Sequence, residues 1–170
     1  MKTIFKTLLA GITATLILTG CGLANQPVLA TSPKIEKNEN GIIIIKQSVN
    51  KFSDEVKGNS PFEEYTKAYK IGLNSVFEKA SKETLSQGKT HFIIVPNNTN
   101  GLEGFPLTKV NDIAEYCLGN YLTKELKNKC KEDSLIDFRT NNITLKVLPL
   151  NNPDYTIPAF DAKLVLEEIK

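Results

Sequence analysis

Histidine is nearly absent from this 170-residue chain, and its scarcity removes most routes to acid–base or nucleophilic catalysis. Any Ser-His-Asp or Cys-His arrangement would have to use the single histidine, His91. That residue precedes Phe92 in a β-branched segment, without the serine or cysteine of the sharp turn that presents a hydrolase nucleophile. We therefore interpret His91 as a structural strand residue.

Metal-binding and phosphate-binding patterns are missing as well. The chain has three cysteines, and Cys117 and Cys130 lack both the short spacing and the histidine partners of a zinc site. The glycines of residues 100–104 are not followed by the helix start that a phosphate-binding loop needs. We expect no metal and no cofactor.

Carboxylates are plentiful, but the sequence does not pair them for catalysis. The adjacent pairs Glu63-Glu64 and Glu167-Glu168 fall in predicted helices, where neighbouring side chains point in different directions. We interpret both pairs as solvated helix faces and assign no catalytic residue. A hydrolase whose carboxylates meet only in the fold remains the alternative.

The longest apolar stretch covers residues 8–18 at the N-terminus, and it is shorter than the roughly 20 residues of a membrane-spanning helix. Lys2 and Lys6 precede it, and a small residue stands directly before Cys21. This order predicts a secretory signal peptide over residues 1–20. A buried core helix, or an ordinary cleaved signal whose cysteine merely lies near the cut, are the alternatives.

The end of that leader, Leu18-Thr19-Gly20-Cys21, resembles the lipobox of bacterial lipoproteins. The resemblance implies that Cys21 is lipidated and becomes the first residue of a membrane-anchored chain. Lipoproteins kept in the inner membrane often carry Asp after the cysteine, so Gly22 favours the outer membrane over the inner one. Stable anchoring takes at least two acyl chains, which lipoprotein-type diacyl modification supplies.

Removal of the leader also changes the charge balance. The precursor has a net charge of +2, and loss of Lys2 and Lys6 makes the mature chain formally neutral. Because the mature chain lacks a strong basic field, we expect no nucleic-acid partner.

The other two cysteines predict a disulfide. In the oxidising cell envelope, the even pair Cys117 and Cys130 is expected to be bridged. Two free buried thiols are the alternative.

Residues 21–40 are polar and contain two prolines, so we interpret them as the lipidated cysteine and a flexible tether. Residues 41–170 then form a single domain. The expected elements are a strand from Ile42, a helix from Ser60-Pro61 to Gly88, a strand over 90–95, two short helices within 111–130, a hairpin over 135–150 and a closing helix over 158–170. They predict an α+β two-layer sandwich with a mixed sheet of about four strands, built from a βαβ unit, a short helical pair, a β-hairpin and the C-terminal helix.

The helix–glycine–strand passage from Ala80 to Phe92 contains Thr84-Leu85 and Gly88. It is similar to a motif, roughly Ala-x-x-x-Thr-Leu-x-x-Gly-x-x-x-Phe, found in small bacterial lipoproteins of uncharacterised function. The resemblance supports the fold and the compartment, and it carries no catalytic residue.

These features predict a non-enzymatic, lipid-anchored envelope module that binds or scaffolds an envelope protein or polymer. The alternative is an envelope hydrolase with a carboxylate site assembled in the fold. The polar loop 97–101 is a candidate ligand contact, and the lysines of residues 124–131 could attract anionic polymers or headgroups. The two leading strands are apolar on both faces, so we hypothesise a patch for self-association or a partner.

Overall fold

The computed structural model describes residues 32–37, 40–49, 56–95, 107–118, 130, 136–137, 141–151 and 158–170. In chain order its elements are β1 (Lys34–Lys37), β2 (Ile43–Ser48), α1 (Pro61–Ser86), β3 (His91–Ile94), α2 (Val110–Leu118), β4 (Ile136–Asp137), β5 (Asn142–Leu150), β6 (Phe160–Asp161) and α4 (Ala162–Glu168). The leader with Cys21, the loop 97–101 and the lysines of 124–131 lie outside the described residues.

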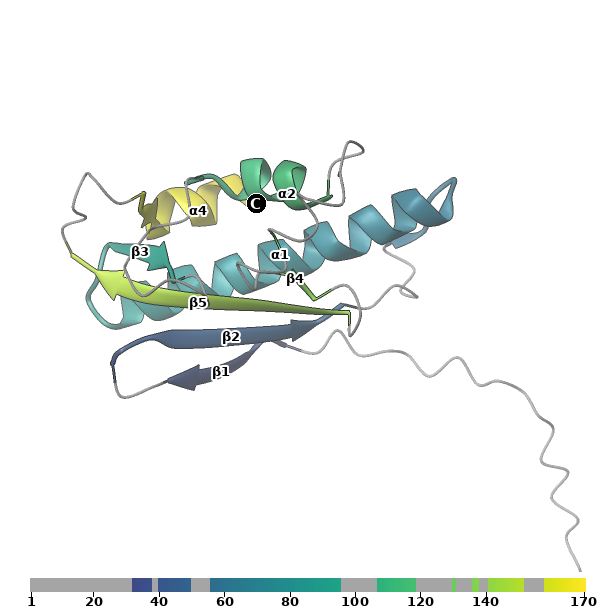
Figure 1. The fold of residues 1–170 in the computed structure, drawn as a ribbon. Coiled ribbons are helices and arrows are strands. Elements are labelled where there is room, and N and C mark those ends of the chain that lie inside the picture. The colour runs from purple at the N-terminus through teal and green to yellow at the C-terminus, as the bar shows by residue number, and fades with distance from the viewer. Residues whose placement is uncertain are drawn as a thin grey trace, which may run out of the picture.

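The strands form one open sheet, which confirms the α+β class (Figure 1). Their order is β1-β2-β5-β3-β6, and β4 also pairs with β5. Every pairing among these strands is antiparallel, so the sheet is not mixed as predicted. The physical reason is that β5 inserts between β2 and β3. The two strands joined by α1 therefore run in the same direction without being neighbours, and the βαβ unit is split.

Strand β1 lies within the segment that we interpreted as a tether. It pairs with β2, with Ile35 opposite Ile45 and Glu36 opposite Ile44. Ile35 packs against the core, and Glu36 forms an ion pair with Lys46 on the other face. The ordered domain therefore begins before residue 41. The sequence of β1 has one isoleucine among charged residues, which is too weak a pattern to predict a strand. Short, charged strands are nevertheless typical of sheet edges.

Helix α1 begins and ends where the sequence predicts. Ser60 is the N-cap, and its hydroxyl accepts a hydrogen bond from the Glu63 N–H at 3.2 Å. The Glu63 carboxylate accepts from the Asn59 N–H at 2.8 Å, one residue before the donor of a standard capping box. At the other end, Gly88 adopts a φ of 69°, the left-handed conformation that favours glycine after a helix.

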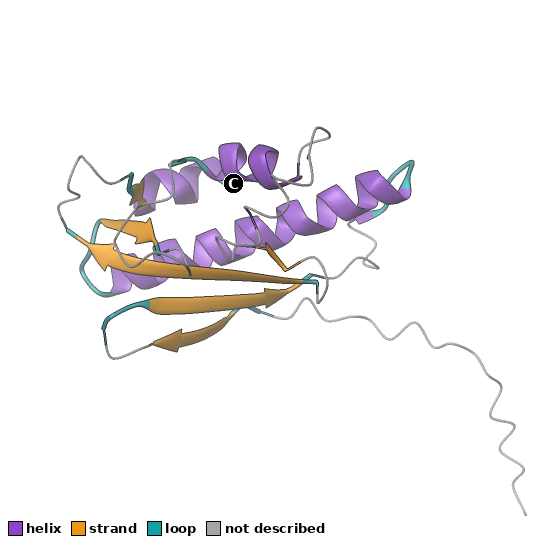
Figure 2. Cartoon of the chain, viewed as in Figure 1, coloured by secondary structure: helices purple, strands orange, loops and turns teal. Residues whose placement is uncertain are grey.

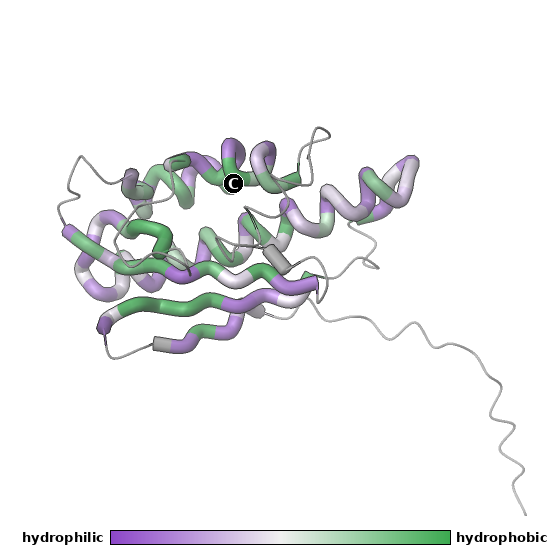
Figure 3. The backbone as a smooth tube through the Cα atoms, viewed as in Figure 1, coloured by the Kyte–Doolittle hydropathy of each residue, from purple (hydrophilic) through white to green (hydrophobic). Residues whose placement is uncertain are grey.

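The core lies between α1 and one face of the sheet, with α2 and α4 packed alongside α1 (Figure 2). Phe77 of α1, Phe92 of β3 and Phe160 of β6 form its aromatic centre, and the Phe92 and Phe160 rings stack at 5.2 Å. The hydropathy colouring shows the apolar run of β2 clearly (Figure 3).

The expectation that both leading strands are buried on two faces holds only for β3. Phe92, Ile93 and Ile94 are all buried in β3. In β2, by contrast, Ile43 and Ile45 are buried while Ile44 is partly exposed. The helices cover only one face of β2, so its alternation is that of a half-buried strand.

The hairpin and the closing helix differ in detail from the expectation. β4 and β5 pair around Asn141, which takes a positive φ of 53°. The closing helix begins at Ala162 rather than near residue 158, because Phe160 and Asp161 pair with β3 as β6. Of the predicted helical pair, α2 ends at Leu118, and only Cys130 of the second helix is described. In the described part of the chain, no helix combines the length and apolarity of a membrane span.

Candidate functional site

A groove of about 610 Å³ lies where the β3–β6 edge meets the start of α2 and the length of α4. The two helices that contribute to its lining, α2 and α4, lie alongside α1 (Figure 1). Its lining combines polar, charged and apolar groups: His91, Thr108, Lys109, Asn111, Asp112, Ala159, Asp161, Leu164, Val165 and Glu168. Its volume lies within the range of known ligand sites, about 300–1,000 Å³.

Asp161 is the last residue of β6, directly before α4, and it lines the groove. As the N-cap of α4 it uses Oδ1 to accept hydrogen bonds from the Lys163 N–H at 2.8 Å and the Leu164 N–H at 3.1 Å. Its other oxygen, Oδ2, points towards the imidazole of His91. One residue thus starts the helix and contributes a carboxylate oxygen to the groove.

Glu168, the last residue of α4, caps a different helix. Its carboxylate oxygens accept hydrogen bonds from the Val110 N–H at 3.2 Å and the Asn111 N–H at 2.8 Å, at the beginning of α2. The first N–H groups of a helix have no partner inside it, and a carboxylate there also complements the helix dipole. Glu168 therefore ties α4 to the start of α2, and both helices contribute to the lining of the groove.

His91 is held in one tautomer by its neighbours when it is neutral. The Thr90 hydroxyl donates its single hydrogen to the Asn151 carbonyl at 2.7 Å, so its oxygen can only accept from His91 Nδ1 at 2.8 Å. The proton of the neutral ring therefore lies on Nδ1, and Nε2 carries a lone pair. Nε2 lies 3.8 Å from Asp161 Oδ2.

The rest of the groove is apolar at its floor and charged at its rim. Val165 is buried beneath it, and Leu164 stands at its edge with 62% of its surface exposed. Asp112 and Lys109, both exposed, bring one charge of each sign from the start of α2. The lining thus contains the carboxylates of Asp112, Asp161 and Glu168 and one ammonium group, that of Lys109.

A smaller cavity of about 160 Å³ lies between α1 and α2. It is lined by Thr66, Lys70, Asn111, Ala114, Glu115 and Leu118. The Thr66 hydroxyl is buried without a hydrogen-bond partner. The volume admits little more than one side chain, so we regard the larger groove as the candidate site.

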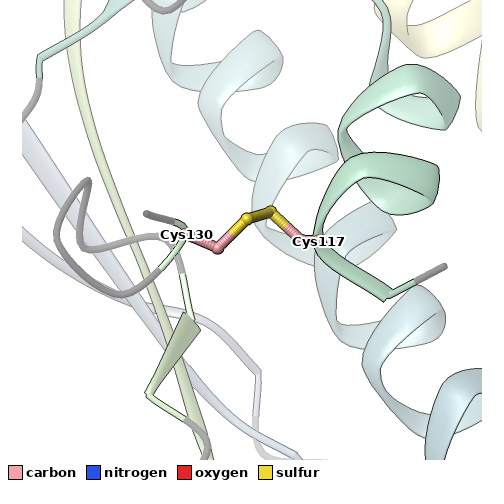
Figure 4. Close-up of a disulfide and its surroundings, with 2 residues drawn as sticks. All are labelled: Cys117 and Cys130. Carbon is pink, nitrogen blue, oxygen red and sulfur yellow. A yellow bond between two sulfur atoms is a disulfide. The ribbon is translucent and has the colours of Figure 1, made fainter. Parts of the chain in front are cut away.

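Cys117 and Cys130 lie at disulfide distance from each other (Figure 4). Their sulfur atoms are 2.20 Å apart, their Cα atoms 5.8 Å, and both residues are fully buried in the core. The pair ties the end of α2 to a position 13 residues further along the chain. The Cys117–Cys130 pair therefore holds the end of α2, and Glu168 holds its start, which lines the groove.

The structure places the residues weighed from the sequence in different roles. Glu63 is a surface residue at the start of α1, while Glu168, interpreted as part of a solvated face, caps α2 and lines the groove. His91, interpreted as structural, lies in a strand but also faces the groove. Asp161 was missed, although an aspartate before an apolar helical segment is a recognisable cap signal. No group of three histidine, cysteine or acidic residues able to hold a metal occurs within the described ranges.

Comparison with protein families, with curated proteins and with solved structures gives no match for this chain.

Proposed function

We propose that this chain is a lipid-anchored binding module of the bacterial cell envelope and that the groove between α2 and α4 is its ligand site. The observation that carries the proposal is the groove, whose volume is about 610 Å³ and whose lining offers an apolar floor with hydrogen-bonding groups around it.

The use of the carboxylates favours binding over hydrolysis. A general acid or base has to exchange a proton with its substrate. Both oxygens of Glu168 accept backbone N–H groups of α2, and Oδ1 of Asp161 accepts two from α4. These carboxylates hold helices in place, so a mechanism that protonates them would loosen the groove during each cycle.

The envelope location is supported by the leader and by the paired cysteines. The lipobox-like Leu18-Thr19-Gly20-Cys21 would supply the anchor, and Gly22 favours the outer membrane. A buried disulfide pair is typical of a protein that folds in an oxidising compartment. The ligand is then an envelope protein or polymer, or a second copy of this chain.

Site-specific photocrosslinking in intact cells tests the groove. A benzophenone amino acid replaces Leu164 at the groove rim, and the matched control carries it at Phe62, an exposed apolar residue of α1 outside the groove. We expect one discrete adduct at position 164 that is absent at position 62. Equal adducts at both positions, or none at 164, would contradict the groove as the ligand site.

The anchor is tested in the same cells with Cys21→Ser. We expect the variant to lose acylation and to leave the membrane fraction. Retention of the processed variant in that fraction would exclude anchoring through Cys21.

A further inference from the structure

The geometry of His91 and Asp161 leads us to infer that the groove recognises a primary ammonium group. This inference rests on the proposed function, because it names the chemistry of the ligand that the same groove binds. It depends on two acceptors that face each other without a donor between them.

The two acceptors are His91 Nε2 and Asp161 Oδ2. Thr90 holds the proton of the neutral imidazole on Nδ1, so Nε2 offers only a lone pair. Asp161 Oδ2 is a carboxylate oxygen and also only accepts. At 3.8 Å the atoms are too far apart to bond directly and repel each other electrostatically. Both side chains are partly exposed, by 25% and 36%, so a ligand can reach the gap.

A primary ammonium group beside the pair can bridge the two acceptors, because a nitrogen about 2.9 Å from each is compatible with acceptors 3.8 Å apart. Its nitrogen carries three donors and a positive charge, so it can donate to Nε2 and to Oδ2 at normal hydrogen-bond distances. A neutral hydroxyl has one hydrogen and can satisfy only one of the two acceptors. A protein metal site generally takes at least three protein ligands, and this pair provides two.

The surrounding charges favour the same ligand. Asp112 and Glu168 add negative charge to the groove, and Lys109 supplies the opposing positive charge at its rim.

The test uses the full mature chain in detergent micelles and two pairs of probes. Nα-acetyl-lysine methylamide is compared with its Nε-acetylated form, and glucosamine with N-acetylglucosamine. Acetylation removes the charge and two of the donors, and we expect it to weaken binding about tenfold or more. Preference for the lysine probe would indicate a peptide source, and preference for glucosamine an amino-sugar source. Both results support the inference.

Two variants separate the acceptor pair from general acidity. Asp161→Asn keeps an N-cap for α4, because asparagine caps as well as aspartate, but its amide can donate to Nε2 and fill the gap. Thr90→Val leaves every charge in place and frees the imidazole proton to move to Nε2. We expect each variant to weaken ammonium binding about tenfold. The matched control Glu167→Gln removes one carboxylate from the exposed face of α4, outside the groove lining, and should change binding less than about threefold.

The nitrogen-15 spectrum of the imidazole reports on the pair directly, since His91 is the only histidine. In the unliganded chain we expect the Nδ1–H tautomer, and on addition of the lysine probe a shift of the Nε2 resonance. An Nε2–H tautomer in the wild-type chain, equal binding of free and acetylated probes, or equal losses in Glu167→Gln and Asp161→Asn would each overturn the inference. A discrete crosslink at position 164 alongside such a result would leave the groove as a binding site and remove only the ammonium assignment.

Discussion

Gly72 of α1 lies directly against Ile143 of β5. A Cβ atom at position 72 would lie 2.7 Å from Ile143 Cδ1 and 3.4 Å from a methyl of Val49. Both positions are buried, so the glycine lets the helix approach the strand more closely than any other residue would. This close approach positions α1, and with it α2 and α4, over the sheet.

We predict that Gly72→Ala destabilises the domain and that Ile143→Val rescues it. The added methyl overpacks the interface at a cost of about 1–3 kcal/mol, against about 1 kcal/mol gained in helix propensity. Ile143→Val alone should cost about 1 kcal/mol, and it removes the atom that the new methyl would meet. Urea denaturation of all four chains measures the coupling. Strictly additive effects would mean that the contact does not limit the approach of α1.

Removal of the Glu168 carboxylate should loosen the start of α2. Glu168→Ala leaves the Val110 and Asn111 N–H groups without their acceptor, and we expect a loss of about 2 kcal/mol. Glu167→Ala is the matched control, because its side chain is exposed and its effect should stay within about 0.5 kcal/mol. Amide exchange should accelerate at Val110 and Asn111 only in the first variant. Unchanged amide exchange at Val110 and Asn111 in Glu168→Ala would show that Glu168 does not cap α2 in solution.

The buried cysteines should be inaccessible to reductant in the folded chain. Cys117 and Cys130 are fully buried, so reduction should require unfolding, and peptide mapping after native treatment with dithiothreitol should recover them bridged. The double replacement of both cysteines by alanine should lower the free energy of unfolding by about 3 kcal/mol in the chain-entropy model. Recovery of both as alkylated free thiols before any reductant is added would rule out the bridge.

The start of α1 should respond to acid through Glu63. The Lys67 ammonium, which lies 2.9 Å from the Glu63 carboxylate, and the Asn59 N–H hold the pKa of Glu63 below its ordinary value. The contribution of Glu63 to stability is therefore present above the ordinary glutamate pKa and is lost as the pH falls through the lowered folded value. A carboxyl carbon-13 titration measures that pKa, and Lys67→Met should raise it. An unchanged pKa in Lys67→Met would mean that Lys67 does not interact with Glu63 in solution.

The sequence predicted local features well because they depend on neighbouring residues. Ser60, Pro61 and Gly88 bound α1 through capping and backbone conformation, and both ends are confirmed. The placement of β5 between β2 and β3 was not predictable, since an alternating apolar pattern shows which face is buried but not which strand lies beside it. The groove was missed for a similar reason. His91 and Asp161 become neighbours only through the β3–β6 pairing, and Glu168 reaches α2 only because α4 follows that strand.

Strand β1 has a consequence for how far the domain can stand from the membrane. If Cys21 carries the lipid as proposed, only the residues between it and Lys34 separate the anchor from the sheet. A fully extended chain of that length spans about 45 Å at most, so the start of β1 can lie no further than that above the lipid surface. A force between a bound ligand and the lipid anchor would act on the N-terminal end of β1. The hydrogen bonds between β1 and β2 would therefore be the first in the domain to bear that force. Insertions before residue 34 should therefore change which envelope layers the domain can reach without altering its fold.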